Sequence, residues 1–301
     1  METALHNILE RVRAAAADAT PLRLCGGGSK DFHGLALEGT PLELRPLRGI
    51  ISYEPTELVV TARAGTPLQE LQATLAQAGQ ALAFEPPHFA LGDKQPTVGG
   101  MVAAGWSGPA RASSGAVRDF VLGVEILNGR GELLRYGGQV MKNVAGYDVS
   151  RLMAGSWGTL GVITEVSLKV LPVAPAQATL VFAMNEAQAL EALNRWGGQP
   201  LPLNASCWAQ GQLWLRLCGA QAAVQAACQK LGGERLPDDQ AAALWHSLRE
   251  QQHPWFAQRS DADALWRLSL PQTAAPLALP EGLAAPLIEW HGAQRWVQAP
   301  R

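Results

Sequence analysis

Residues 155–163 read GSWGTLGVI and run directly into an alternating stretch that ends at Leu171, and this passage decides the fold. Apolar and polar side chains alternate from Val162 to Val170, which predicts a half-buried strand. The glycines before the strand lack side chains, so their backbone can approach a phosphate group closely. We therefore expect a glycine-rich loop that leads into a strand beside a ligand site.

Two more glycine-rich stretches lie beside predicted strands. The segment 26–30 follows a short strand at 21–25, and the segment 96–108 reads PTVGGMVAAGWSG. Both mix glycine with serine or threonine, whose hydroxyls can add hydrogen bonds to those of the backbone. One such loop alone is as well explained by a turn, but three of them favour a site for an extended anionic cofactor.

The usual nucleotide and metal motifs are missing from the sequence. No G-x-G-x-x-G opens a β-α-β unit, which argues against a Rossmann NAD site, and no G-x-x-x-x-G-K-[ST] is present, which excludes a P-loop. The four cysteines form no C-x-x-C pair and the six histidines form no H-E-x-x-H pair, so we expect no metal held by this chain. A cofactor site built from several distant loops remains.

The composition is that of a soluble globular protein. Of the 301 residues 48% are hydrophobic and 17% charged, and the net charge of -2 offers no basic face for a nucleic acid. No run of about eighteen apolar residues could span a membrane. Residues 1–20 form an amphipathic pattern without the apolar core of a signal peptide, so we expect a cytoplasmic location.

The first half mixes predicted strands and helices. Residues 57–63 are rich in β-branched side chains and predict a strand. Residues 66–69 predict a capping box at the start of a helix that ends at Gly79, and 81–84 return as a strand, which completes a β-α-β unit. Two further elements are predicted, a hairpin over 121–138 with its turn at 128–131 and a short helix capped by Asp148.

The second half begins after the Pro172–Pro175 linker and has its own order of elements. It predicts a β-α-β-β-α-β succession, which is the ferredoxin-like arrangement. The expected elements are a strand at 178–183, a helix at 186–196 capped by Asn185, strands at 203–209 and 212–218, a helix at 220–231 and a strand at 234–236. A helix at 239–251 and strands near 264–270, 286–291 and 294–297 follow.

Several phrases together resemble the FAD-linked oxidases of the vanillyl-alcohol oxidase type. They are GGGS at 26–29, TVGGMVAAGWSG at 97–108, SSGAVRDFVLGVEILNGRGEL at 113–133, KNVAGYD at 142–148 and GSWGTLGVIT at 155–164. Within that family the chain is most similar to the FAD-binding subunits of bacterial glycolate oxidase, through these phrases and through LWHSLREQQHPWF, LWRLSLP and IEWHGAQRW near the C-terminus. The resemblance covers about residues 20–298.

The resemblance implies an α+β protein of two domains. Residues 1–172 would form a PCMH-type FAD-binding domain of two subdomains, and residues 173–301 a reduced ferredoxin-like cap domain. Members of the family continue into a glycine- and proline-containing tail, so ending at Arg301 predicts a member shortened at its C-terminus.

The resemblance also implies the residues that hold the cofactor, FAD. The first loop and the start of the second would contact the pyrophosphate, the rest of the second would pass near the isoalloxazine, and the third would line the flavin from the other side. The expected residues are Gly26, Gly27, Gly28, Ser29, Lys30, Thr97, Gly99, Gly100, Ala103, Ala104, Gly105, Trp106, Ser107, Gly108, Gly158, Gly161, Val162 and Ile163. Many relatives attach FAD covalently through a histidine in the first loop, but His33 comes several residues late, so we expect noncovalent FAD.

The sequence departs from catalytic relatives where substrate would be handled. Trp157 stands where many carry glutamate, and Trp106 where they often carry asparagine. No motif like H-G-D-G-N-x-H follows residue 172, so the catalytic residues stay unassigned. Candidates to attract an anionic substrate are Arg111, Arg118 and Lys142, although exposed basic residues seldom do so.

These features favour one part of a larger enzyme. The leading hypothesis is an FAD-binding subunit of a multi-subunit glycolate dehydrogenase, beside a catalytic flavin subunit and an iron–sulfur subunit that pass electrons towards quinone and link the complex to the inner face of the membrane. A self-sufficient 2-hydroxy-acid dehydrogenase and an assembly subunit without flavin are the alternatives. The eight tryptophans beyond residue 190 fit either a packed small domain or a docking face for those partners.

Overall fold

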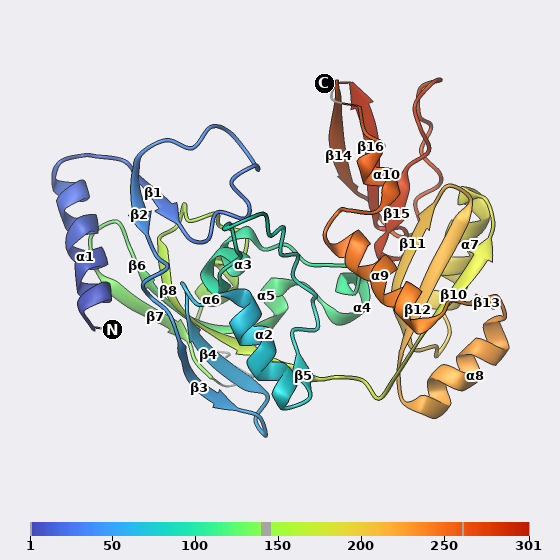
Figure 1. The fold of residues 1–301 in the computed structure, drawn as a ribbon, viewed down its shortest axis with the longest axis horizontal. Helices are drawn as coiled ribbons and strands as arrows, with labels where there is room; N and C mark the ends of the chain where they lie inside the picture. Colours follow the sequence, from blue (N-terminus) through green and yellow to red (C-terminus); the bar gives the residue numbers. More distant parts are fainter. Residues whose placement is uncertain (1, 140–145, 261, 301) are drawn as a thin grey trace. The chain divides into compact units, whose positions relative to one another are not determined.

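The computed structural model describes residues 2–139, 146–260 and 262–300, drawn as a ribbon in Figure 1. The chain forms two compact units. The first comprises Met1–Ser107 and Ala116–Val173, and the second comprises Gly108–Gly115 and Ala174–Arg301. Helices and sheets occur in both units, which confirms the predicted α+β class. In the described residues no helix is long and apolar enough to cross a membrane.

The first unit is built on a five-stranded antiparallel sheet of order β3-β4-β8-β6-β7. Its strands are β3 (Ile50–Glu54), β4 (Val59–Arg63), β8 (Val162–Lys169), β6 (Val121–Leu127) and β7 (Leu133–Gly137). The predicted hairpin is confirmed, because the Asn128 side chain accepts hydrogen bonds from the N–H groups of Arg130 and Glu132 in the turn. The predicted half-buried character of β8 is wrong. Six of its eight residues are buried, on both faces of the strand, and only Glu165 and Lys169 are partly exposed.

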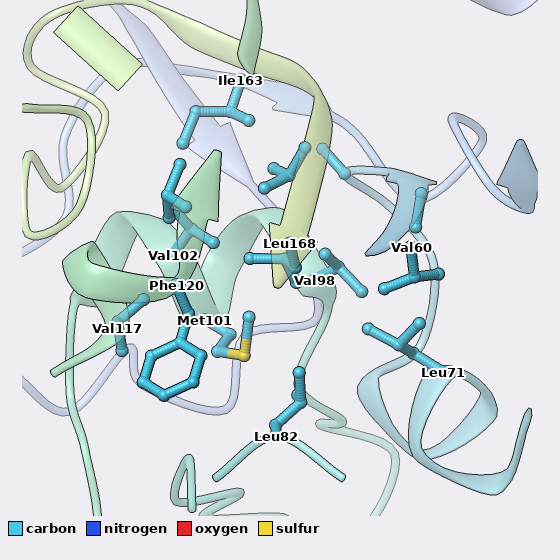
Figure 2. Close-up of a cluster of buried hydrophobic side chains, with 14 of the residues drawn as sticks. Val60, Leu71, Leu82, Val98, Met101, Val102, Val117, Phe120, Ile163 and Leu168 are labelled. Carbon is cyan, nitrogen blue, oxygen red and sulfur yellow. The ribbon is translucent and has the colours of Figure 1, made fainter. Parts of the chain in front are cut away.

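Two helices, α2 (Leu68–Gln77) and α3 (Val98–Ala104), supply apolar side chains to the main core of this unit. Figure 2 shows Leu71 of α2 and Met101 of α3 in one cluster with Phe120 and Leu168. Val98 and Val102 of α3 are fully buried in this cluster. The core therefore fixes the helix that carries the second glycine loop.

A second layer carries the first glycine loop. Helix α1 (Glu2–Ala17) places Ile8 and Val12 in a smaller core with Leu42 of β2 (Thr40–Glu43). Strand β1 (Leu22–Cys25) pairs in parallel with β2, and Leu22 and Leu24 pack against the same core. The loop that begins at Gly26 therefore leaves a paired strand.

Two further local predictions in the first unit are wrong. Thr66 does not cap α2, because its hydroxyl bonds instead to the backbone N–H and carbonyl of Gly49 at 2.9 and 3.2 Å. The expected strand at 81–84 is reduced to β5 (Gln80–Ala81), and β5 pairs with β9 (Leu171–Pro172) rather than beside β4, so the segment is no β-α-β unit of one sheet. Leu82 and Phe84 instead enter the core.

The remaining helices of the first unit are short. They are α5 (Val117–Phe120) and α6 (Val149–Leu152). Asp148 accepts a hydrogen bond from the N–H of Arg151 at 3.1 Å, which confirms it as the cap of α6. Asp119 likewise accepts from the N–H of Ala116 at 2.9 Å at the start of α5.

The second unit contains a seven-stranded sheet of order β13-β10-β12-β11-β15-β16-β14. Its first four positions are the ferredoxin-like order 4-1-3-2, all antiparallel, which confirms the predicted succession. The elements of this motif are β10 (Ala176–Ala183), α7 (Glu186–Gly197), β11 (Leu203–Ala209), β12 (Gln212–Gly219), α8 (Gln221–Leu231) and β13 (Glu234–Arg235). The capping box of Asn185 and Gln188 on α7 is present.

The rest of the second unit extends this sheet and covers it. The further elements are α9 (Asp238–Arg249), α10 (Pro254–Ala257), β14 (Asp263–Ser269), β15 (Leu287–Glu289), the short 3-10 helix η1 (Trp290–Gly292), β16 (Gln294–Pro300) and the inserted α4 (Arg111–Ser114). Trp208, Trp245, Trp255 and Trp296 are buried among apolar neighbours, whereas Trp266 is 50% exposed. Most of the tryptophan side chains therefore serve packing.

Candidate functional site

One cavity of about 340 Å³ in the first unit is lined by all three glycine loops. The loops come from the ends of β1, from α3 and from the approach to β8, so elements far apart in sequence meet here. Ile163 belongs both to this lining and to the core shown in Figure 2. The residues expected from sequence that line the cavity are Gly26, Gly27, Gly28, Ser29, Lys30, Thr97, Gly99, Gly100, Ala103, Ala104, Gly158, Gly161 and Ile163.

The first and second loops approach so closely that side chains are excluded between them. A Cβ on Gly27 would lie 1.5 Å from the carbonyl oxygen of Gln95, and one on Gly26 would lie 2.8 Å from Oγ1 of Thr97. The backbone of one loop therefore rests directly on the other. Glycine is required at Gly27, because a backbone carbonyl, unlike a flexible side chain, cannot move aside at low energetic cost.

The second and third loops are joined by backbone hydrogen bonds. The N–H groups of Gly155 and Trp157 donate to the carbonyls of Val102 and Ala103 at 3.0 and 2.9 Å. Gly105 ends α3 in the left-handed conformation, with φ of 67°, and a Cβ there would lie 2.8 Å from the backbone of Gly155. These contacts fix the third loop against α3.

The loops differ in the hydrogen-bond donors that they can offer a ligand. Within the second loop, the N–H of Gly99 donates to the carbonyl of Ala64 at 2.8 Å, and that of Gly100 donates to Oγ1 of Thr97 at 3.2 Å. In the first loop, the N–H groups of Gly27, Gly28 and Ser29 meet no acceptor among the described residues. The first loop can therefore donate backbone hydrogen bonds to a ligand. The second loop contributes mainly a surface without side chains, which a ligand can approach closely.

Charged side chains around the cavity are mostly engaged with each other. Lys94 lies 3.6 Å from Asp31, and Arg45 lies 3.0 Å from Glu43. Lys30 donates to Oγ of Ser29 and to the carbonyl of Pro87 at 3.3 and 3.2 Å. Sequence reasoning missed Arg23, a residue of β1 that lines the cavity. Bare backbone, open N–H donors and the guanidinium of Arg23 together fit an extended anionic ligand.

The rings of His33 and Trp157 line the cavity beside the third loop, and a cluster of further aromatic rings packs against them. We call this set of rings, namely Phe32, His33, Phe89, Trp106 and Trp157, the aromatic wall. The His33 ring stacks on Trp157 with centroids 4.7 Å apart and planes 22° apart. Trp106 packs edge-on against both, at 4.9 Å from His33 and 5.6 Å from Trp157. Trp157 has φ of 52°, and a bulky residue in this left-handed region is strained. The third loop thus holds Trp157 at the cavity in a costly conformation.

Five residues expected at the cofactor do not line this cavity. Gly105 joins loops two and three, and Trp106 stands in the aromatic wall behind His33 and Trp157. Oγ of Ser107 accepts a hydrogen bond from the N–H of Val117 at 3.1 Å, and this bond joins the residues that flank the 108–115 segment. Gly108 belongs to the second unit, where its carbonyl accepts from the Trp290 indole, and Val162 is buried in the smaller core.

None of the candidate substrate-attracting residues in the described part of the chain lines the cavity. The Arg111 guanidinium lies 4.4 Å from the centre of the Trp290 ring, so it takes part in a cation–π contact of the second unit. Arg118 is exposed on α5 in the first unit. Lys142 lies outside the described residues. Arg111 and Arg118 therefore belong to different units of the chain.

A second cluster, missed by sequence reasoning, lies around His291. Trp290 and His291 are consecutive residues in the left-handed region, with φ of 54° and 57°. Nε2 of His291 lies 3.0 Å from Oγ of Ser113, its backbone N–H donates to Oγ of Ser206 at 3.0 Å, and its Nδ1 is buried without a partner among the described residues. Burial lowers the pKa of His291 to about 4, so its imidazole is neutral at pH 7. This cluster fastens the inserted 108–115 segment to the rest of the second unit.

Comparisons with known proteins point to a flavin. Residues 5–137 match the family model described as FAD binding domain. The glycolate oxidase subunit GlcE of Escherichia coli is 48% identical over 97% of this chain and 80% of its own length. The D-lactate dehydrogenase of Anaerostipes hadrus and the glycolate oxidase subunit GlcD of Bacillus subtilis are 33% and 32% identical, each over 52% of this chain. The matches span 31% and 32% of those two relatives, so they concern only part of each.

Solved structures support the fold. An alkyldihydroxyacetonephosphate synthase superposes with a TM-score of 0.69 over 97% of this chain and 68% of its own, at 15% identity. At that identity the likeness concerns the fold alone.

Proposed function

Since this chain belongs to the FAD-linked oxidoreductase family that includes the glycolate oxidase subunit GlcE of Escherichia coli, we propose that it is the FAD-binding subunit of a multi-subunit enzyme that oxidises glycolate or a related 2-hydroxy acid. The observation that carries the proposal is the single cavity lined by all three glycine loops. The 48% identity along nearly the whole chain supports the same role.

The cavity residues would divide the work of holding FAD. The N–H groups of Gly27, Gly28 and Ser29 would donate to the diphosphate, while Gly99 and Gly100 let the cofactor approach α3 closely. Ala103, Ala104, Gly158, Gly161 and Ile163 would line the flavin, whose isoalloxazine supplies a two-electron acceptor when FAD is bound. The ring of His33 is stacked on Trp157. This packing contact explains the presence of a histidine here without a covalent bond to the cofactor, so it supports noncovalent attachment.

The cavity is poorly equipped to oxidise a 2-hydroxy acid by itself. That reaction needs a base for the hydroxyl proton and a cation for the carboxylate. Of the three carboxylates that line the cavity, Asp31 and Glu43 are paired with Lys94 and Arg45, and the lining beside the third loop is formed by the rings of His33 and Trp157. These observations support a subunit whose flavin carries electrons or stabilises the assembly, with substrate oxidised on a catalytic flavin partner.

Onward electron transfer would require another partner. In the described part of the chain no group of three or more His, Cys, Asp and Glu side chains is placed to hold a metal ion. We therefore assign the iron–sulfur cluster to a separate subunit. We also assign the chain to the cytoplasm, where any contact with the inner face of the membrane would come through these partners.

The proposal predicts that the isolated chain, reconstituted with FAD, does not reduce an artificial dye with glycolate or D-lactate. The same preparation added to separately purified catalytic and iron–sulfur subunits should restore dye reduction that those subunits lack without it. Dye reduction by the isolated chain would instead identify a self-sufficient dehydrogenase. Restoration of activity by a colourless chain that binds no FAD would identify an assembly subunit without flavin.

A further inference from the structure

The charged side chains that line the cavity do not all form ion pairs with one another. Four basic and three acidic side chains line it, namely Arg23, Lys30, Arg45 and Lys94 against Asp31, Glu43 and Asp93. Lys94 pairs with Asp31 and Arg45 pairs with Glu43, while Lys30 bonds to a hydroxyl and a carbonyl. Arg23 forms no ion pair with any described carboxylate. Of the two arginines that line the cavity, Arg45 is paired with a carboxylate of the described chain and Arg23 is not.

Arg23 also has a buried donor without an acceptor. Its Nε is shielded from solvent and meets no hydrogen-bond partner in the described residues. A buried guanidinium N–H left unbonded is energetically unfavourable, so such a group marks a place for a missing acceptor. Its flanking residues Leu22 and Leu24 pack into the smaller core, which leaves Arg23 on the alternate side of β1.

Arg23 lies close in sequence to the loop whose backbone N–H groups are unbonded within the described residues, and both line the same cavity. It lies three residues before Gly26, on the strand that leads into the first loop, and both border the same cavity. A diphosphate carries negative charge on several oxygens, and a guanidinium binds phosphate oxygens through parallel N–H donors. The N–H groups of Gly27, Gly28 and Ser29 would meet the same ligand from the loop side.

We propose that Arg23 is the cation that binds the diphosphate of the bound dinucleotide, with the first loop supplying neutral backbone donors beside it. The inference rests on the proposed function, because it takes the cavity as the site of FAD. It assigns the charge recognition to a strand residue rather than to the glycine loop or to Lys30. Riboflavin, which shares the ring system but has no phosphate, should not depend on Arg23.

The test is a titration of apo-protein with FAD and with riboflavin, followed by flavin fluorescence. For Arg23→Met we expect the dissociation constant of FAD to rise about 10- to 100-fold, the range of a lost charged hydrogen bond, while that of riboflavin changes by less than about two-fold. Arg23→Lys should recover part of the FAD affinity, because it restores the charge without the paired N–H geometry.

A matched control removes a paired cation from the same lining. The double variant Glu43→Gln/Arg45→Met loses one charge of each sign, so it leaves the net charge of the cavity unchanged and should bind FAD within about three-fold of wild type. Unchanged FAD affinity in Arg23→Met would overturn the assignment, as would an equal loss of riboflavin, which would point to a structural role. A wild-type chain that binds neither flavin would count against the proposed function itself.

Discussion

The Gly27→Ala variant is expected to lose FAD binding while its second unit stays folded. The added Cβ would lie 1.5 Å from the carbonyl oxygen of Gln95, a distance that no two non-bonded atoms can share. The first loop must therefore move off the second, and the donors of Gly27, Gly28 and Ser29 leave the cavity with it. Titration of the apo-variant should show at least about a 100-fold rise in the dissociation constant of FAD, equivalent to about 3 kcal/mol.

The matched control for Gly27→Ala is Gly129→Ala. Gly129 lies in the exposed turn between β6 and β7, and a Cβ there meets no atom within 4 Å. This variant should bind FAD like wild type. If Gly27→Ala also bound FAD like wild type, the close contact between the first and second loops could not be what shapes the cofactor site.

The second large effect concerns the stability of the second unit in acid. Burial lowers the pKa of His291 to about 4 from an ordinary value of 6.5, so the folded state holds this imidazole neutral. A depressed folded pKa gives stability that is present above pH 6.5 and is lost as the pH falls through about 4. The shift corresponds to about 3 kcal/mol of unfolding free energy, lost between these two pH values.

The variant His291→Asn should remove that loss. Asparagine does not titrate here and tolerates the left-handed backbone conformation of His291. The measurement is urea unfolding followed by tryptophan fluorescence, which reports mainly on the second unit. Between pH 7 and pH 4 the free energy of unfolding should fall by about 3 kcal/mol more in wild type than in the variant.

Two other histidines of the second unit must be considered when this experiment is interpreted. Burial also lowers the pKa of His253, so acid destabilises the second unit through both residues, and only the difference between wild type and His291→Asn isolates His291. His246→Asn, on an exposed position of α9, is the matched control and should behave like wild type. An identical pH dependence in wild type and His291→Asn would contradict the burial of a neutral imidazole at Ser113.

The three glycine loops and the elements beside them were predictable from sequence, because each loop adjoins a strand or helix with strong apolar patterning. That the loops meet at one site was expected from the resemblance to FAD-linked oxidases. Val98, Met101 and Val102 give α3 one buried face, and the alternation after Gly161 gives β8. The order of elements in the second unit followed from the same periodicities and from the capping residues of α7. These signals are local, so one chain suffices to show them.

The features that were missed depend on partners distant in sequence. Thr66 and Gln69 have the spacing of a capping box, but Gly49 takes the Thr66 hydroxyl. Arg23 has the sequence pattern of an ordinary strand residue, and only the structure shows that it borders the cavity with its buried Nε left unbonded by every described residue. Gly108 continues the second loop in sequence, yet its carbonyl accepts from the indole of Trp290, 182 residues away. No local pattern encodes such contacts.

The most direct test of the central claim is the visible absorption spectrum of the freshly purified chain, recorded before and after acid denaturation and centrifugation. Convergence of three bare-backbone loops on one noncovalently held FAD predicts flavin bands that move into the supernatant with the released cofactor. A colourless chain that takes up no added FAD would contradict the site, and colour that stays with the denatured pellet would contradict noncovalent binding.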